Sequence, residues 1–88
     1  MVEWKLVYTI QAQKDAKKIS AAGLKEKVIQ ILEIIKTNPF QTPPHFEKLL
    51  GDLSGVYSRR INIHHRLIYQ VLDDQKIVKI IRMWTHYE

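Results

Sequence analysis

Four side chains in the second half of this 88-residue chain are of the types that together break a phosphodiester bond. Glu47 is a carboxylate that can accept a proton, and the imidazole of His86 can donate one near neutral pH. Arg60 and Arg66 carry planar guanidinium groups, whose geometry suits the oxygens of a phosphate. The stretch between Glu47 and His86 is therefore our candidate for acid and base chemistry on a phosphate group.

Each of these residues also has a simpler interpretation. A single arginine or glutamate is most often a solvated or salt-bridged surface group, and a histidine near a chain end is usually just exposed. A catalytic site is favoured because all four residues occur together in the second half of the chain. Metal binding is not expected, because His64 and His65 point to opposite faces of an extended chain and His45 has no evident partner. The chain has no cysteine, which excludes disulfides and thiolate metal sites.

Composition predicts one basic globular domain spanning residues 1–88. Fourteen Lys and Arg oppose nine Asp and Glu, so the net charge is +5. Such a surface suits a polyanion or an acidic protein partner, although solubility alone explains it equally well. The most apolar stretch, residues 28–35, is interrupted by Gln30 and Glu33 and is too short for a membrane. With no export signal readable either, we expect a cytoplasmic protein without membrane contact.

The first half reads as a strand followed by two helices. Residues 4–9 are rich in aromatic and β-branched types, which favours a strand. Ala12, Ala16 and Ile19 then recur at helical spacing, in a helix expected to end near Gly23. The second helix should end at Asn38 and Pro39. Its apolar face is formed by Leu24, Val28, Ile31, Leu32 and Ile35.

The second half reads as three strands, over residues 56–63, 67–72 and 76–83. His64 and His65 lie near the first turn, and the polar residues 73–75 form the second, so the strands can pair as an antiparallel meander. This order predicts an α+β domain of two layers, β-α-α-β-β-β, with both helices on one face of an antiparallel sheet. Pairing would bring Arg60 close to Arg66 on the open face, with an anion between them.

The residues of this half resemble the YoeB (Txe) family of bacterial toxins. The resemblance is carried by the runs Phe46-Glu47-Lys48-Leu49, Leu53-Ser54-Gly55-Val56-Tyr57-Ser58-Arg59-Arg60-Ile61, His65-Arg66-Leu67-Ile68-Tyr69 and Trp84-Thr85-His86-Tyr87. The amino-terminal helices agree with the family in order and length. That family belongs to the wider RelE-like toxins, which cut messenger RNA in the ribosomal A site and are held inactive by an antitoxin. The resemblance implies a RelE-like fold and an endoribonuclease.

The resemblance also implies a role for each candidate residue. Glu47 corresponds to the general base, His86 to the general acid, and Arg60 and Arg66 to arginines that bind the phosphate and stabilise the transition state. Tyr87 corresponds to the adjacent aromatic residue. Neither a metal nor another cofactor is expected. The products would carry a 2′,3′-cyclic phosphate or its opened form, and DNA would not be cut.

Three features near the site depart from the family pattern or leave a choice open. The family commonly has a lysine three residues after its glutamate, where this chain has Leu50, so Lys48 joins Arg59 among the expected RNA-binding residues. The family often ends in Arg-Tyr-His-Tyr, whereas here Trp84 and Thr85 precede the histidine. Tyr57 or Tyr87 could stack on a base of the RNA, although Tyr57 could equally belong to the core.

The resemblance implies partners too. We expect an acidic cognate antitoxin of the YefM or Phd type, the ribosome and its messenger RNA, and a possible homodimer. Two other functions share the same charge pattern. One is an RNA-binding or ribosome-binding module without turnover, and the other is a partner that binds an operator together with its antitoxin.

Overall fold

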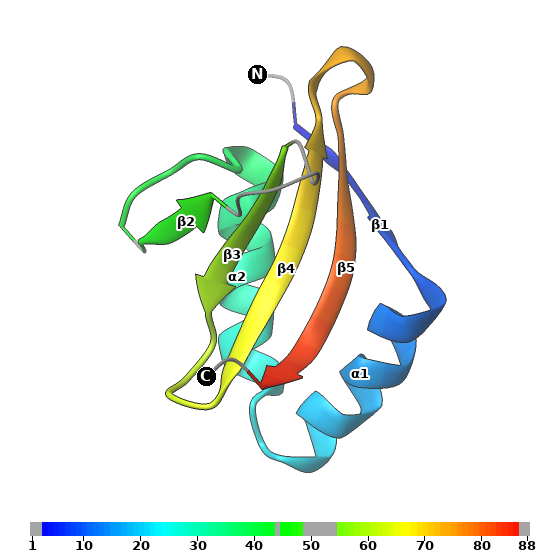
Figure 1. Cartoon of the computed structure of the whole chain (residues 1–88), viewed down its shortest axis with the longest axis vertical. Coiled ribbons are helices and arrows are strands. Elements are labelled where there is room, and N and C mark those ends of the chain that lie inside the picture. Colours follow the sequence, from blue (N-terminus) through cyan, green and yellow to red (C-terminus); the bar gives the residue numbers. More distant parts are fainter. Residues whose placement is uncertain (1–2, 44, 49–54, 87–88) are drawn as a thin grey trace.

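The computed structural model describes residues 3–43, 45–48 and 55–86, except for the side chains of residues 85 and 86. It is an α+β domain of two layers, as predicted (Figure 1). A 3₁₀ turn, Asp73–Gln75, connects the last two strands. The helices and strands are β1 (Lys5–Tyr8), α1 (Ile10–Ala21), α2 (Lys25–Thr37), β2 (Phe46–Lys48), β3 (Val56–Arg60), β4 (His65–Leu72) and β5 (Ile77–His86).

The five strands form one sheet in the order β1-β5-β4-β3-β2. The predicted meander of β3, β4 and β5 is confirmed, since each neighbouring pair is antiparallel. The sheet is mixed, however, because β1 pairs parallel with β5, from Lys5 opposite Ile77 to Tyr8 opposite Ile80. The three residues of β2 add an edge strand next to β3 that the sequence had not indicated.

Local signals in the sequence explain where the helices begin and end. Thr9 caps α1, because its hydroxyl oxygen accepts a hydrogen bond from the Ala12 amide at 3.0 Å. The same hydroxyl donates to the carbonyl of Ile81 at 2.8 Å, which ties the start of α1 to β5. Gly23, with φ of 75°, turns the chain between the helices in a conformation that glycine adopts without strain.

The core lies between the helices and one face of the sheet. In Figure 1, α2 passes behind the sheet and α1 runs beside β5, so the opposite face of the strands is turned to the viewer. Neither described helix is long and apolar enough to span a bilayer. The buried apolar side chains come from both layers: Ala12, Ile19, Val28, Ile31, Ile35, Ile61, Leu67, Tyr69, Val78, Ile80 and Met83.

Candidate active site

The open face of the sheet carries a small pocket. Because side chains alternate along a strand, the inward positions of Leu67 and Tyr69 leave Arg66 on the outer face of β4. Cross-strand partners share a face, so Arg60, which pairs with Arg66, lies there too. A pocket of about 270 Å³ is lined by His45, Glu47, Ser58, Arg60 and Arg66. The structure thus brings together the predicted base and both predicted phosphate-binding arginines.

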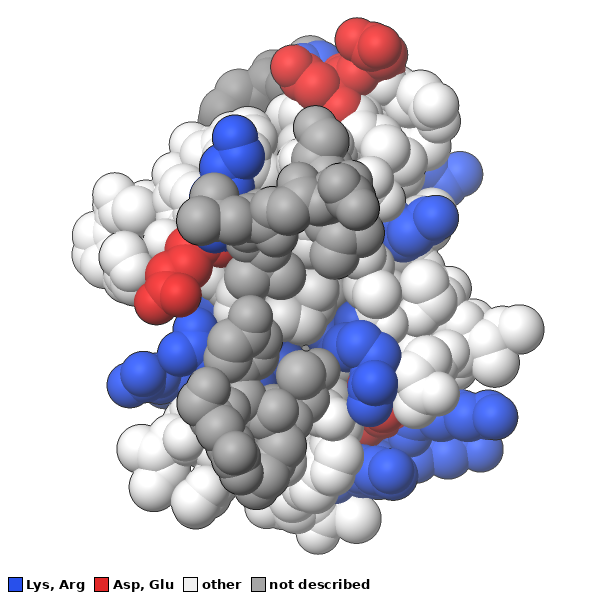
Figure 2. All heavy atoms as spheres, viewed as in Figure 1, with Lys and Arg blue, Asp and Glu red and all other residues white. Residues whose placement is uncertain are grey.

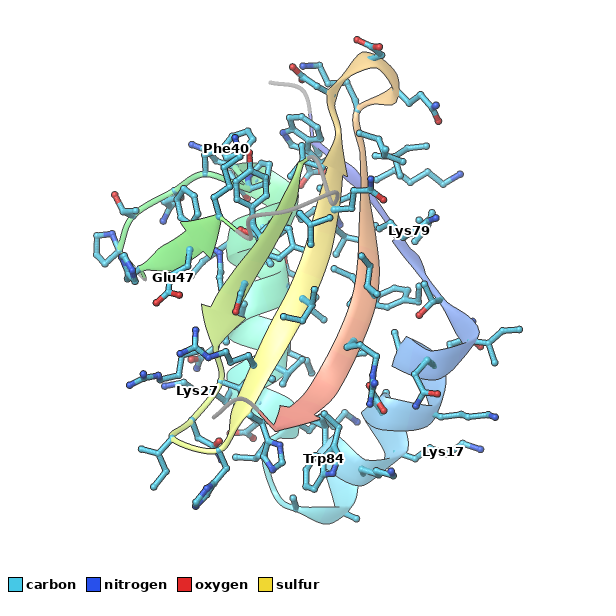
Figure 3. The ribbon with its side chains drawn as sticks, viewed as in Figure 1. Lys17, Lys27, Phe40, Glu47, Lys79 and Trp84 are labelled. Atoms are coloured by element: carbon cyan, nitrogen blue, oxygen red, sulfur yellow. The ribbon has the colours of Figure 1, made fainter. Side chains whose placement is uncertain are left out.

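Glu47 forms an ion pair in this pocket. Its carboxylate oxygen Oε2 lies 3.5 Å from Nη1 of Arg66, and its Oε1 lies 3.9 Å from Nε2 of His45. The Glu47 side chain is 53% exposed, whereas that of Arg66 is 18% exposed. Figure 3 shows Glu47 projecting from the edge strand β2. The carboxylate is accessible to a substrate, and the guanidinium beside it is held partly within the sheet face.

The two arginines bring positive charge to the pocket from adjacent strands. Arg60 and Arg66 are direct partners across the β3–β4 ladder, as the meander predicted. Arg60 is exposed. Two guanidinium groups that approach each other repel, and an anion between them would relieve the repulsion. Figure 2 shows basic side chains over much of this view, with the largest groups in its lower half, while the largest acidic patches lie at the turn between β4 and β5 and at β2.

Arg59 has a structural role instead of the predicted phosphate contact. It is 1% exposed and lies on the opposite face from Arg60. Its Nη2 donates hydrogen bonds to the carbonyls of Pro39 and Gln41 at 3.0 and 2.9 Å, and its Nε donates to the hydroxyl of Tyr69 at 3.1 Å. A phosphate cannot reach this guanidinium. Arg59 instead fixes the segment that leads from α2 to β2.

Tyr57 belongs to an aromatic cluster on the same side as Arg59. Its ring centroid lies 5.4 Å from that of Phe40, 5.7 Å from that of Phe46 and 5.8 Å from that of Tyr69. Of its two interpretations, packing within the fold is therefore the one that applies. Lys48 pairs with Tyr57, so it too lies on the face opposite the pocket, but it is exposed on the edge strand and its contact with RNA stays a prediction.

His65 and Trp84 form the end of the sheet near the pocket. Their rings stack with centroids 3.8 Å apart and planes 23° from parallel. His65 pairs with His86 across the β4–β5 ladder, and Arg66 pairs with Thr85. The backbone at His86, the predicted acid, thus runs beside the strand that carries Arg66. The side chain of His86 and all of Tyr87 lie outside the described residues.

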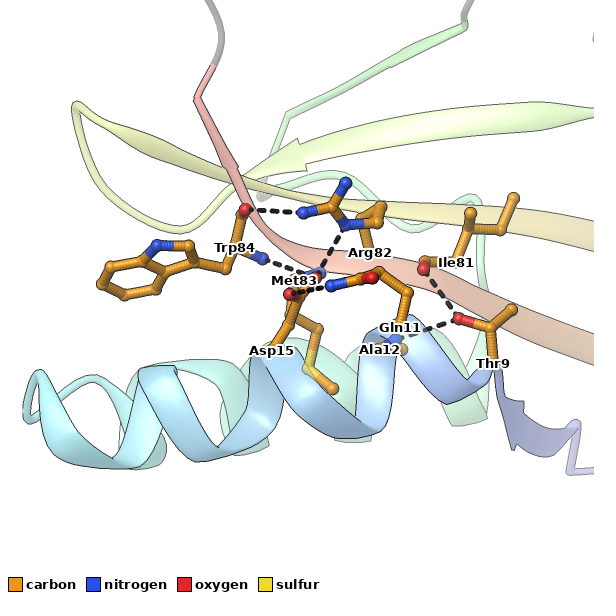
Figure 4. Close-up of polar contacts among 8 residues, drawn as sticks. All are labelled: Thr9, Gln11, Ala12, Asp15, Ile81, Arg82, Met83 and Trp84. Atoms are coloured by element: carbon orange, nitrogen blue, oxygen red, sulfur yellow. Dashed lines mark hydrogen bonds and ion pairs between the residues drawn. The ribbon is translucent and has the colours of Figure 1, made fainter.

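Asp15 anchors β5 close to this end of the sheet, and nothing in the sequence analysis had singled it out (Figure 4). Its fully buried Oδ2 accepts hydrogen bonds from Nε of Arg82 at 2.8 Å and from the amides of Met83 and Trp84 at 3.0 and 3.2 Å. Gln11 donates to Oδ1 at 3.0 Å. Burial alone would raise the pKa of Asp15, but these hydrogen bonds outweigh burial and lower it.

Asp15 also explains how β5 departs from a regular ladder. The register between β4 and β5 shifts on both sides of Ile68, which pairs with Arg82. Two consecutive amides, those of Met83 and Trp84, then turn toward one carboxylate instead of alternating between neighbouring strands. A detectable signal was present, since Asp15 lies between Ala12 and Ile19 on the apolar stripe of an otherwise lysine-rich helix.

Among the described side chains, those of residues 3–43, 45–48 and 55–84, no three His, Asp or Glu groups come together in a way that could hold a metal ion.

Comparison with known proteins links this arrangement to one toxin family. The sequence model of a family described as the YoeB-like toxin of bacterial type II toxin–antitoxin systems matches residues 4–87. The chain is 39% identical over 62 residues to Toxin YoeB of Streptomyces coelicolor, an alignment that covers 70% of this chain and 71% of that protein.

Solved structures agree with the sequence relatives. The YoeB/ParE toxin from Agrobacterium tumefaciens has a TM-score of 0.84 and 32% identity, over 94% of this chain and 99% of that one. Two structures from Staphylococcus aureus, a YoeB dimer and a YoeB–YefM complex, give TM-scores of 0.81 and 0.79. Both are 32% identical, and both alignments cover 98% of this chain and all of the other.

Proposed function

Since the chain belongs to the YoeB-like toxins of bacterial type II toxin–antitoxin systems, we propose that it is an endoribonuclease that cuts messenger RNA in the ribosomal A site. The observation that carries this proposal is the pocket in which Glu47 meets Arg60 and Arg66. A carboxylate beside two guanidinium groups supplies both a proton acceptor and a cradle for a phosphodiester.

In the proposed reaction, Glu47 removes the proton from a ribose 2′-hydroxyl, and the 2′-oxygen attacks the neighbouring phosphorus. Arg60 and Arg66 neutralise the negative charge that grows on the phosphate oxygens. The bond from phosphorus to the 5′-oxygen then breaks, and His86 gives that oxygen a proton. The upstream fragment ends in a 2′,3′-cyclic phosphate. Protein groups perform every step, so the scheme uses no metal.

In the resting state of this scheme, before RNA binds, Glu47 forms an ion pair with Arg66. An incoming phosphate competes with the carboxylate for the guanidinium of Arg66. Once the phosphate binds there, Glu47 loses its partner and becomes available to the 2′-hydroxyl. Binding and activation of the base are then coupled through a single arginine, which also discriminates against substrates that lack the phosphate.

The partners of the proposed toxin follow from its charge and its relatives. A net charge of +5 suits an acidic antitoxin, and the S. aureus relative has been solved in complex with YefM. We propose a YefM-like antitoxin for this chain, and self-association like that of the S. aureus dimer. Because its target is the translating ribosome, the proposed toxin acts in the cytoplasm.

Cleavage by the full chain on programmed ribosomes tests the proposal. Ribosomes with an occupied P site and an empty A site are mixed with wild type, Glu47→Gln or His86→Gln, and the RNA ends are mapped. We expect the wild type to cut within the A-site codon and to leave a 2′,3′-cyclic phosphate. Both variants should be slower by about 10²–10⁴-fold.

Glu26→Gln, a change at an exposed carboxylate of α2, is the matched control and should cut like the wild type. A wild-type protein that binds the ribosome without cutting would instead identify a non-catalytic binding module. A wild-type protein that acts only on operator DNA together with its antitoxin would identify a co-repressor. A 2′-deoxy nucleotide at the cleavage position should block cutting while leaving binding intact.

A further inference from the structure

Ser58 lies at the bottom of the pocket that holds Glu47 and Arg66. It is the central residue of β3, and its cross-strand partners are Glu47 on one side and Ile68 on the other. It is 1% exposed, compared with 53% for the side chain of Glu47. The most buried of the side chains that line the pocket is therefore a hydroxyl directly beside the proposed base.

The Ser58 hydroxyl has no hydrogen-bond partner among the described residues, although it is buried. A serine hydroxyl donates one hydrogen bond and accepts two, and leaving it unmatched away from water costs stability. Buried polar groups in folded proteins are nearly always paired, so an exception of this kind calls for a physical reason. No hydrogen bond to another described residue ties this hydroxyl to the fold.

The ion pair above Ser58 suggests the reason. Glu47 and Arg66 line the same pocket as this buried hydroxyl and lie 3.5 Å apart. When a phosphate takes Arg66 away from Glu47, the two side chains separate and the bottom of the pocket opens. The Ser58 hydroxyl, which can donate a hydrogen bond, would then be exposed beside the phosphate, whose oxygens can accept one.

We propose, building on the function proposed above, that Ser58 is a substrate-binding residue whose hydroxyl donates a hydrogen bond to a phosphate oxygen of the bound RNA. Arg60 and Arg66 hold the phosphate by charge, and Ser58 adds a third donor from the floor of the pocket between them. An unpaired hydroxyl is preorganised for this task, since no internal hydrogen bond has to break before it binds.

The test compares the full-length wild type with Ser58→Ala, with Ser20→Ala as the control at an exposed serine of α1. Three quantities are measured: the free energy of unfolding in urea, the Kd for programmed ribosomes whose message carries a 2′-deoxy nucleotide at the cleavage position, and the single-turnover cleavage rate. We expect Ser58→Ala to weaken binding and slow cleavage by about tenfold or more without loss of stability. Ser20→Ala should match the wild type throughout.

Wild-type binding and cleavage by Ser58→Ala would overturn the proposal. So would a loss of activity that is accompanied by a comparable loss of stability, because the hydroxyl would then serve the fold. Ser58→Cys, of similar shape but with a weaker donor, should fall between the other two proteins. A wild type that binds the message without cutting it would refute the ribonuclease, while the Kd values would still decide the role of Ser58.

Discussion

The buried carboxylate of Asp15 on α1 lies 2.8 Å from Nε of Arg82 on β5. This pair joins the first helix to the last strand at the place where β5 leaves its regular register. Asp15 also holds the amides of Met83 and Trp84, so a single side chain fixes three groups of β5. The geometry of the last part of β5, which ends at His86, therefore depends on a residue 67 positions before Arg82.

Replacement of Asp15 by asparagine should destabilise the fold markedly. The amide retains the shape of the side chain but loses the charge that strengthens its hydrogen bonds, which are worth about 1.5–3 kcal/mol each when one partner is charged. Because Arg82 is 40% exposed and can be hydrated, we expect a net loss of about 2–3 kcal/mol in urea denaturation. Asp74→Asn, at an exposed position, should change stability by less than about 0.5 kcal/mol, and equal effects of the two changes would contradict this role for Asp15.

The stabilisation by Asp15 should depend on pH in a defined direction. Its pKa is lowered in the folded protein, so the unfolded chain binds a proton more readily than the folded one as the pH falls. The contribution is fully present above the ordinary carboxyl pKa of about 3.9 and is lost as the pH falls through the lower folded value. The stability difference between wild type and Asp15→Asn should therefore shrink with acidification. A stability difference that grew toward low pH would show that folding does not lower the pKa of Asp15.

Adjacent arginines should give opposite results when each is changed to glutamine. Arg59→Gln removes a buried group that holds two carbonyls and a tyrosine hydroxyl, so it should lower the free energy of unfolding by about 3 kcal/mol or more. Arg60→Gln alters an exposed side chain and should leave stability within about 0.5 kcal/mol, while slowing RNA cleavage by about 10²–10³-fold. Urea denaturation and cleavage assays on both variants measure the contrast. Loss of stability in Arg60→Gln, or none in Arg59→Gln, would refute it.

Binding and cleavage should separate in Glu47→Gln. The neutral amide no longer competes with phosphate for Arg66, so affinity for a message with a 2′-deoxy nucleotide should equal or exceed that of the wild type. Salt titration adds a second measure. The slope of log K against log salt should stay the same in this variant. In Arg60→Gln, the magnitude of that slope should fall by about 0.7 if Arg60 contacts a phosphate of single-stranded RNA. An unchanged slope in Arg60→Gln would remove Arg60 from the phosphate site.

The sequence contained enough to predict the meander and the pairing of Arg60 with Arg66. Both follow from the alternation of side chains and from short polar turns, which are local properties. The same alternation separates Arg59 from Arg60, so including both in one RNA-binding set was inconsistent with it. Arg59 is buried, and it donates hydrogen bonds to carbonyls 18 and 20 residues earlier in the chain. This is a tertiary effect that the neighbouring residues in the sequence do not reveal.

Other parts of the fold depend on contacts that no local pattern carries. The parallel pairing of β1 with β5 joins opposite ends of the sequence, and β2 has only three residues, so neither leaves a strong periodic signal. The role of Asp15 is similar. Its position on an apolar stripe marked it as unusual, but only the path of β5 supplies its partners.

The position of β5 in the sheet also constrains when a nascent chain can become active. Of the described strands, β5 is the last in the sequence, yet it lies between β1 and β4, and the bond from Thr9 to Ile81 spans 72 residues. At roughly 5–20 residues per second, translation leaves β1 without its neighbour for several seconds. Glu47, Arg60 and Arg66 emerge before the strand that carries His86. A growing polypeptide therefore lacks the proposed catalytic set until β5 has been made, which would delay the proposed attack on the ribosome that is making it.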